Sequence, residues 1–200
     1  MRRLLFTALL CTSFFASSEE TISRWMSDYF KRIHDHIGNE NYEKAEYELE
    51  MGNNNYFRGG RTYEAALLYQ LYGQFYAVQS QYTEAVPWFE KALATDKMPR
   101  IGAQEVRFQL AQTYFMIGKY ENVISLLEEF IRVGERYKYP VSARANLLMS
   151  YSHGRLEQYE PSYYHIKQAN NKSDKPQIDW IEYAFSLAMK LESLDDAEDL

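Results

Sequence analysis

Cysteine and long apolar runs are both scarce in this chain of 200 residues. The only cysteine, Cys11, lies in an apolar run at residues 4–15, which two arginines precede and small residues follow. That order is typical of a secretory signal peptide. The run is also too short to span a bilayer comfortably, since spanning takes about 20 apolar residues. We therefore expect residues 1–18 to direct export and to be cleaved after Ala16 or Ser18. Retention as a membrane anchor is the alternative.

Basic residues are the minority among the charges, and loss of this segment would make them scarcer. Removal of Arg2 and Arg3 leaves 20 of the 22 basic residues against 28 acidic ones, so the formal charge changes from −6 to −8. Nucleic acids and anionic membranes are poor partners for such a chain, because neutralising phosphates takes clustered Lys and Arg. No later segment is long and apolar enough to cross a membrane. We expect a periplasmic protein that does not insert into the membrane after cleavage, and without cysteine it can form neither disulfides nor thiolates.

Tyrosine, by contrast, is abundant, with 18 copies. Four of them recur in similar settings, NYEKA, QYTEA, KYENV and QYEPS. These settings place Tyr42, Tyr82, Tyr120 and Tyr159 at intervals of 40, 38 and 39 residues. Self-similarity at a fixed period of about 20 to 50 residues indicates a solenoid built from repeated units.

Apolar residues on both sides of these tyrosines follow the three-and-four spacing of helices with a buried stripe. Glycine and proline segments separate the stripes. We predict an all-α solenoid of about four helix pairs within residues 19–177, at 21–52, 61–97, 99–134 and 140–171. Residues 178–200 are expected to form a capping helix with an acidic tail, or else that helix begins a fifth pair. Each of the four tyrosines should start the second helix of its pair, with its ring wedged against the first.

The spacing also resembles the tetratricopeptide repeat (TPR) pattern of a leucine–alanine or leucine–glycine step, a tyrosine, a turn, a second tyrosine, an alanine, an aromatic residue and another alanine. The resemblance is best from Tyr69 to Phe130, where Tyr82 is followed by Ala85, Phe89 and Ala92. It implies a right-handed superhelix whose first helices line a concave groove. Residues 84–127 further resemble periplasmic TPR proteins encoded beside the energy-transducing components TonB, ExbB and ExbD. Those inner-membrane components are the partners that this resemblance implies.

Carried over by position, the resemblance implies a groove that binds a peptide or protein partner. Its residues would be Phe30, His34, Gln70, Gln74, Ala77, Phe108, Gln112, Phe115, Met116, Arg144, Leu147 and Tyr151. Glutamines can hydrogen-bond an extended peptide, and the aromatic and methionine side chains offer an adaptable apolar floor. Each aromatic residue could equally pack against the neighbouring repeat.

Candidates for chemistry are few, and the sequence predicts no catalytic residue, metal or cofactor. His34 and His36 point about 200° apart on a helix, so they cannot share a metal ion from one face. His153 lacks the companions of a general base and is read as a substituted core position. A second functional class remains open beside the groove-binding adaptor. In that alternative the chain is a structural oligomer in which Trp180, Phe185 and the last helix pack against another copy.

Overall fold

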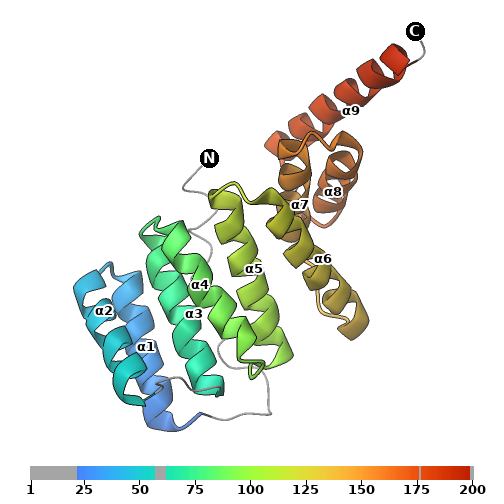
Figure 1. Ribbon diagram of the computed structural model, residues 1–200. Coiled ribbons are helices and arrows are strands. Elements are labelled where there is room, and N and C mark those ends of the chain that lie inside the picture. Colours follow the sequence, from blue (N-terminus) through green and yellow to red (C-terminus); the bar gives the residue numbers. More distant parts are fainter. Residues whose placement is uncertain (1–21, 57–61, 176, 199–200) are drawn as a thin grey trace. The chain divides into compact units, whose positions relative to one another are not determined.

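The structure is a computed structural model that describes residues 22–56, 62–175 and 177–198, so the expected signal segment at 1–18 lies outside the described residues. All regular elements in these ranges are helices (Figure 1). They are α1 (Arg24–Gly38), α2 (Tyr42–Met51), the π-helical turn η1 (Gly52–Tyr56), α3 (Tyr63–Val78), α4 (Tyr82–Ala94), α5 (Arg100–Met116), α6 (Tyr120–Tyr137), α7 (Ala143–Arg155), α8 (Tyr159–Asn171) and α9 (Ile178–Glu198). The predicted all-α class is confirmed.

Helices follow one another in pairs along the chain, α1 with α2, α3 with α4, α5 with α6 and α7 with α8. Each pair falls in one of the four predicted repeat segments, although α6 runs past residue 134 to Tyr137. The acidic tail expected after the last helix is corrected, because α9 continues to Glu198. Residues 192–198 contain neither glycine nor proline, so no breaker ends the helix earlier.

A single turn geometry joins the two helices of every pair. Each of the four recurring tyrosines is the first residue of a second helix, as predicted. Two positions earlier the backbone is left-handed, with φ of 59° at Glu40, 63° at Ser80, 77° at Gly118 and 59° at Glu157. The residue between the left-handed residue and the tyrosine donates its backbone N–H to the carbonyl of the residue five positions before it, in the first helix, over 2.8 to 2.9 Å. A left-handed residue followed by this bond satisfies carbonyls that a helix end would leave unpaired.

The second helices bury the same repeat positions. Three residues after each tyrosine stand small or β-branched side chains, and seven residues after it stand large apolar ones. All eight are 0% exposed: Ala45, Ala85, Val123 and Ser162 in the first set, and Leu49, Phe89, Leu127 and Ile166 in the second. The small set lets the paired helices approach, and the large set fills the core beside them.

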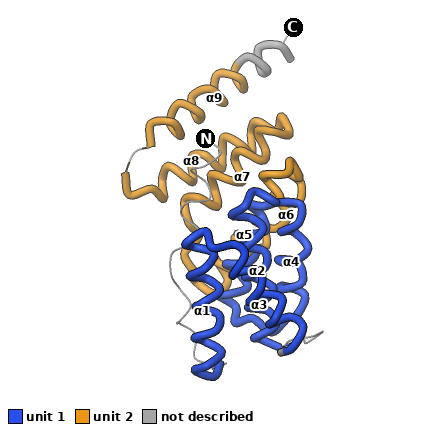
Figure 2. The backbone as a smooth tube through the Cα atoms, turned by 90° about the vertical axis from the view of Figure 1, so that its left-hand side faces the viewer, with its two compact units in different colours: residues 1–113 blue, residues 114–200 orange. Residues whose placement is uncertain are grey.

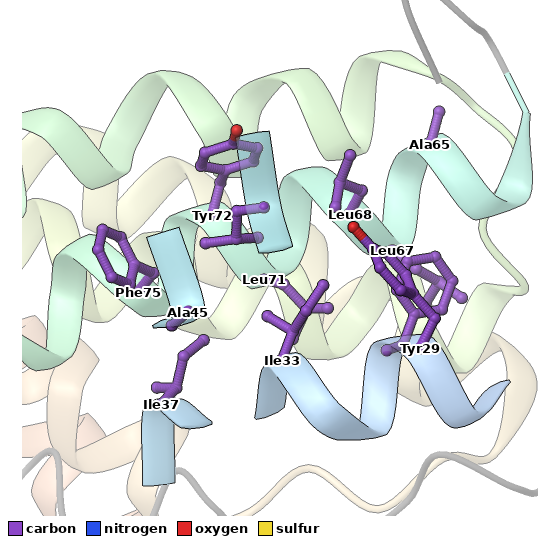
Figure 3. Close-up of a cluster of buried hydrophobic side chains, with 12 residues drawn as sticks. Tyr29, Ile33, Ile37, Ala45, Ala65, Leu67, Leu68, Leu71, Tyr72 and Phe75 are labelled. Carbon is purple, nitrogen blue, oxygen red and sulfur yellow. The ribbon is translucent and has the colours of Figure 1, made fainter. Parts of the chain in front are cut away.

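The chain divides into two compact units, residues 1–113 and 114–200, with the boundary inside α5 (Figure 2). In the first unit, α3 packs against α1, α2 and α4. Ile33 of α1 shares one core with Leu68 and Leu71 of α3, and each of the three is at most 1% exposed (Figure 3). Because helices lie on several sides of it, α3 is buried almost all round rather than along one stripe.

One close contact in this unit depends on glycine. The Phe89 ring of α4 is fully buried, and it lies directly over Gly73 of α3. A Cβ at position 73 would come within 2.6 Å of the ring carbons. The ring therefore occupies the space that any larger residue at position 73 would need.

In the second unit, α7 packs against α6 and α8, and α8 packs against α9. Two serines lock α7 to α8. The Ser150 hydroxyl donates to the carbonyl of Ser162 at 2.7 Å, and the Ser162 hydroxyl donates to the carbonyl of Ser150 at 2.8 Å. Both side chains are fully buried, so each hydroxyl has exchanged water for a partner on the facing helix. The serine that replaces the repeat's usual alanine thus adds a specific link.

The last helix, α9, turns one apolar face toward α8. Leu187 is 2% exposed in a core with Leu147 and Ile166, and Trp180 and Tyr183 pack around it. Within the described residues, no helix combines the length and the apolar character that crossing a bilayer requires.

Candidate partner-binding surface

The groove expected in the first unit is largely a core. Phe30 and Ala77 are each 1% exposed, and Phe30 belongs to the α1–α3 cluster. These two residues are corrected from groove to core, because helices on several sides cover positions that a single pair would leave open. His34 and Phe108 are half-buried and keep part of their surface accessible.

The groove glutamines are also inside. Gln70 is 4% exposed, and its side-chain amide donates to Oε1 of Gln109 on α5 at 3.2 Å. Gln74 and Gln112 are 9% and 6% exposed. A buried amide needs a hydrogen-bond partner inside the protein, and Gln70 has one in the next repeat. In this structure Gln70 links α3 to α5, so it does not lie open to a peptide.

One face of α5 keeps the best part of the expected groove. Phe108, Gln112, Phe115 and Met116 stand at intervals of four, three and one residues, which places them on one side of the helix. Phe108, Phe115 and Met116 are half-buried. The Phe115 ring meets the edge of Tyr120 with the centroids 5.5 Å apart. We call Phe108, Phe115 and Met116 the α5 strip.

The remaining groove residues lie on α7. Arg144 is exposed, Leu147 is 7% exposed within the second unit's core, and Tyr151 is half-buried. The Tyr151 ring packs edge-on against Tyr183 of α9, with the centroids 5.1 Å apart. Burial raises the pKa of Tyr151, and the nearby Tyr183 and Asp179 raise it further. Of this set only Arg144 is exposed.

Histidines and acidic residues in the described part of the chain do not gather into a metal site. That part contains no group of three or more His, Cys, Asp or Glu side chains placed to hold a metal ion. His153 and His165 do stack, with ring centroids 5.6 Å apart. Burial lowers the pKa of His165 to about 4, helped by His153 and Lys172, so this ring is neutral at pH 7. His153 forms a hydrogen bond with Oε1 of Gln158 through Nδ1 at 2.7 Å.

An aromatic cluster in the first unit escaped the sequence analysis. The Trp88 indole of α4 stacks on the Tyr72 ring of α3 at 4.0 Å between centroids, with the planes 10° apart. The Lys91 ammonium lies 4.1 Å from the indole centroid. Burial raises the pKa of Tyr72, and the carboxylate of Glu50 adds to the rise. The stack of Trp88 on Tyr72 fastens α4 to α3, and Lys91, on the same helix as Trp88, places a cation over the indole. The spacing of three residues between Trp88 and Lys91 is the only signal of this cluster in the sequence.

The chain is similar to several proteins of known structure. No protein-family model matches the chain, and no curated protein matches its sequence. A structure of MamA 41-end from Desulfovibrio magneticus RS-1 is similar with a TM-score of 0.67 at 17% identity, over 90% of this chain and 92% of that one. A Podosopora anserina putative kinesin light chain with nearly identical TPR-like repeats gives 0.66 at 12% identity, over 90% and 93%.

A third similar structure, MamA AMB-1, gives a TM-score of 0.58 at 17% identity and covers 84% of this chain and 98% of that one. Identities this low establish the fold and nothing further. The fold is TPR-like, and its class is that of all-α helical-repeat proteins.

Proposed function

We propose that the chain is a non-catalytic scaffold that binds a protein or peptide partner through its first helices. The observation that carries the proposal is the α5 strip, in which Phe108, Phe115 and Met116 share one face and remain partly exposed. Aromatic side chains and methionine are enriched where proteins bind one another, because they offer a large contact area and adapt their shape. The TPR-like fold supports the same reading, since solenoids of stacked helix pairs commonly bind partners along an extended surface.

A photocrosslinking experiment tests this surface. A photoreactive phenylalanine analogue at position 115 should give one dominant adduct in cells. The same analogue at position 47, where Tyr47 is 64% exposed on α2, is the matched control for an accessible aromatic site. A Met116→Ala variant should weaken the adduct at 115 while leaving the helical circular dichroism unchanged. Equal adducts at both positions, or none at 115, would remove the α5 strip as the binding surface.

We further propose that this binding takes place in the periplasm. The support is the order of basic, apolar and small residues at 1–18. N-terminal sequencing of the protein recovered from its host should begin at Ser17 or Glu19. A chain that retains Met1 and stays in the cytoplasmic fraction would contradict export, and one that retains it in the membrane fraction would favour the anchor.

The finer proposal is that the partner belongs to a TonB–ExbB–ExbD type complex. It depends on the resemblance of residues 84–127 to periplasmic TPR proteins of such systems. Mass spectrometry of the adduct at position 115 should identify a component of that complex. Recovery of an unrelated envelope protein would refute this partner and would leave the scaffold proposal intact.

A further inference from the structure

A second apolar face of α9 is exposed, opposite the one that packs on α8. Ile178, Ile181, Phe185 and Met189 are 71%, 50%, 68% and 51% exposed. Their spacing of three, four and four residues forms one stripe along the helix. We call these four residues the α9 stripe. Capping helices of repeat arrays usually carry a polar outer face, whereas this face of α9 is apolar.

The stripe differs from the other exposed apolar side chains in the described ranges. The remaining large ones, Trp25, Tyr47, Ile101, Tyr137 and Tyr164, lie on five different helices. Scattered apolar residues are normal on a protein surface, whereas a contiguous set indicates a contact surface. The interpretation that Trp180 and Phe185 share one interface is corrected here, because Trp180 packs within the second unit and Phe185 faces away from it.

Three residues of the stripe are evenly spaced, so this part of it can pack against the same part of a second copy of the chain. Ile181 and Met189 lie four residues before and after Phe185. A two-fold interface must be self-complementary, so a residue on one copy meets the equivalent set on the other. In an antiparallel pair of α9 helices centred on Phe185, the two phenylalanines meet, and Ile181 of each copy faces Met189 of the other.

The charges beside the stripe favour the same arrangement. Asp179 and Glu182 lie near the start of α9 and Lys190 lies toward its far end, and all three are exposed. They occupy the same flank of the stripe, 60° to 140° around the helix from Phe185 by the roughly 100° step per residue. Antiparallel pairing about a two-fold axis keeps this flank of both copies on the same side of the seam, so Lys190 of one copy lies on the side of Asp179 and Glu182 of the other. Parallel pairing places the two flanks on opposite sides of the seam, where these opposite charges do not meet. Lys190 also contacts the Tyr159 ring at 4.6 Å, which leaves its positive charge in place.

We propose that the α9 stripe is a homodimer interface in which two α9 helices pack antiparallel about Phe185. This surface is separate from the α5 strip, and the inference does not depend on the scaffold function. Four side chains make a contact smaller than the roughly 800 Å² per partner of a standard interface, so the dimer should be weak and should form only at high protein concentration.

Sedimentation velocity across a wide concentration range tests the association. The chain should shift from monomer to dimer as concentration rises, and Phe185→Glu should remain monomeric with unchanged helical content. Tyr164→Glu, at a 58% exposed aromatic residue of α8, is the matched control and should still dimerise. A monomer at all concentrations, or a dimer that survives Phe185→Glu, overturns the proposal. A monomer that instead co-sediments with anionic or neutral lipid vesicles through Phe185 assigns the stripe to a membrane surface and also overturns it.

Disulfide crosslinking tests the antiparallel geometry. In a Cys11→Ser background, an introduced cysteine is the only one in the chain. Phe185→Cys should form a covalent dimer on oxidation. Ile181→Cys alone should crosslink poorly, but a mixture of Ile181→Cys and Met189→Cys chains should crosslink efficiently. Efficient self-crosslinking of Ile181→Cys with no mixed product would indicate parallel helices and refute the antiparallel pairing.

Discussion

Glycine at the left-handed turn of the fourth helix pair should stabilise the protein, although glycine usually weakens a helical protein. Glu157 adopts φ of 59° between α7 and α8, in the turn that Gly118 makes with φ of 77° between α5 and α6. A residue with a Cβ costs roughly 1–2 kcal/mol in this conformation. Glycine removes that cost but adds about 0.5–1 kcal/mol of unfolded-state entropy. We therefore expect Glu157→Gly to raise the free energy of unfolding by about 0.5–1 kcal/mol.

Replacing Gly118 by alanine is the reverse substitution, and it tests the backbone effect alone because the added methyl group would not clash with any neighbour. A Cβ at Gly118 would have nothing nearer than the Tyr120 hydroxyl at 4.0 Å, so Gly118→Ala should cost about the same amount through the backbone alone. With a urea m-value of about 2 kcal/mol/M, each change moves the unfolding midpoint by about 0.3–0.5 M, in opposite directions. Glu128→Gly, at an exposed site inside α6, is the control and should lower the midpoint. If Glu157→Gly lowers it as well, the reasoning is wrong.

Three further predictions concern buried groups. His165 titrates at about 4 in the folded state against 6.5 unfolded, so the unfolded chain binds more protons between these values and stability should fall as pH drops from 6.5 to 4. Because the ring is partly solvated, the loss should be about 1–2 kcal/mol rather than the full shift, and His165→Gln should flatten this part of a urea-midpoint profile. Gly73→Ala should destabilise by about 1–3 kcal/mol by driving its methyl into the Phe89 ring, which a lower thermal midpoint would reveal. Tyr82→Ala, at a 9% exposed ring, should cost about 2–3 kcal/mol and Tyr120→Ala, at a half-buried one, less; equal urea midpoints would contradict this order.

The helix pairs and their turns could be predicted from the sequence because local rules govern both. Apolar spacing and breakers located the pairs, and the recurring Tyr42, Tyr82, Tyr120 and Tyr159 marked the start of each second helix. The left-handed residue of the turn was visible only at Gly118, since glutamate and serine occupy that place in the other three. Glutamate and serine occur in many conformations, so their presence in the sequence does not indicate a left-handed backbone.

The side of each first helix that meets solvent could not be predicted, because it depends on how many neighbours surround the helix. Phe30 and Gln70 were expected in a groove by position in the repeat, but the structure buries both. The partner of Gln70 lies 39 residues away, and nothing local announces it. For α9, two apolar stripes on one helix were already present in the sequence, and separating Trp180 from Phe185 by helical angle would have found the exposed one.

The hydrogen bond between Gln70 and Gln109 has a consequence for how such an array could evolve or be redesigned. Stacked repeats held only by apolar contacts could be duplicated, deleted or reordered at little energetic penalty. A buried amide that loses its partner costs about 1–3 kcal/mol, so α3 is matched to the helix that now follows its pair. Inserting an extra helix pair between α4 and α5 would separate the two glutamines and strand both amides. The order of the second and third pairs is therefore favoured by a specific hydrogen bond between them, in addition to being set by the continuous backbone.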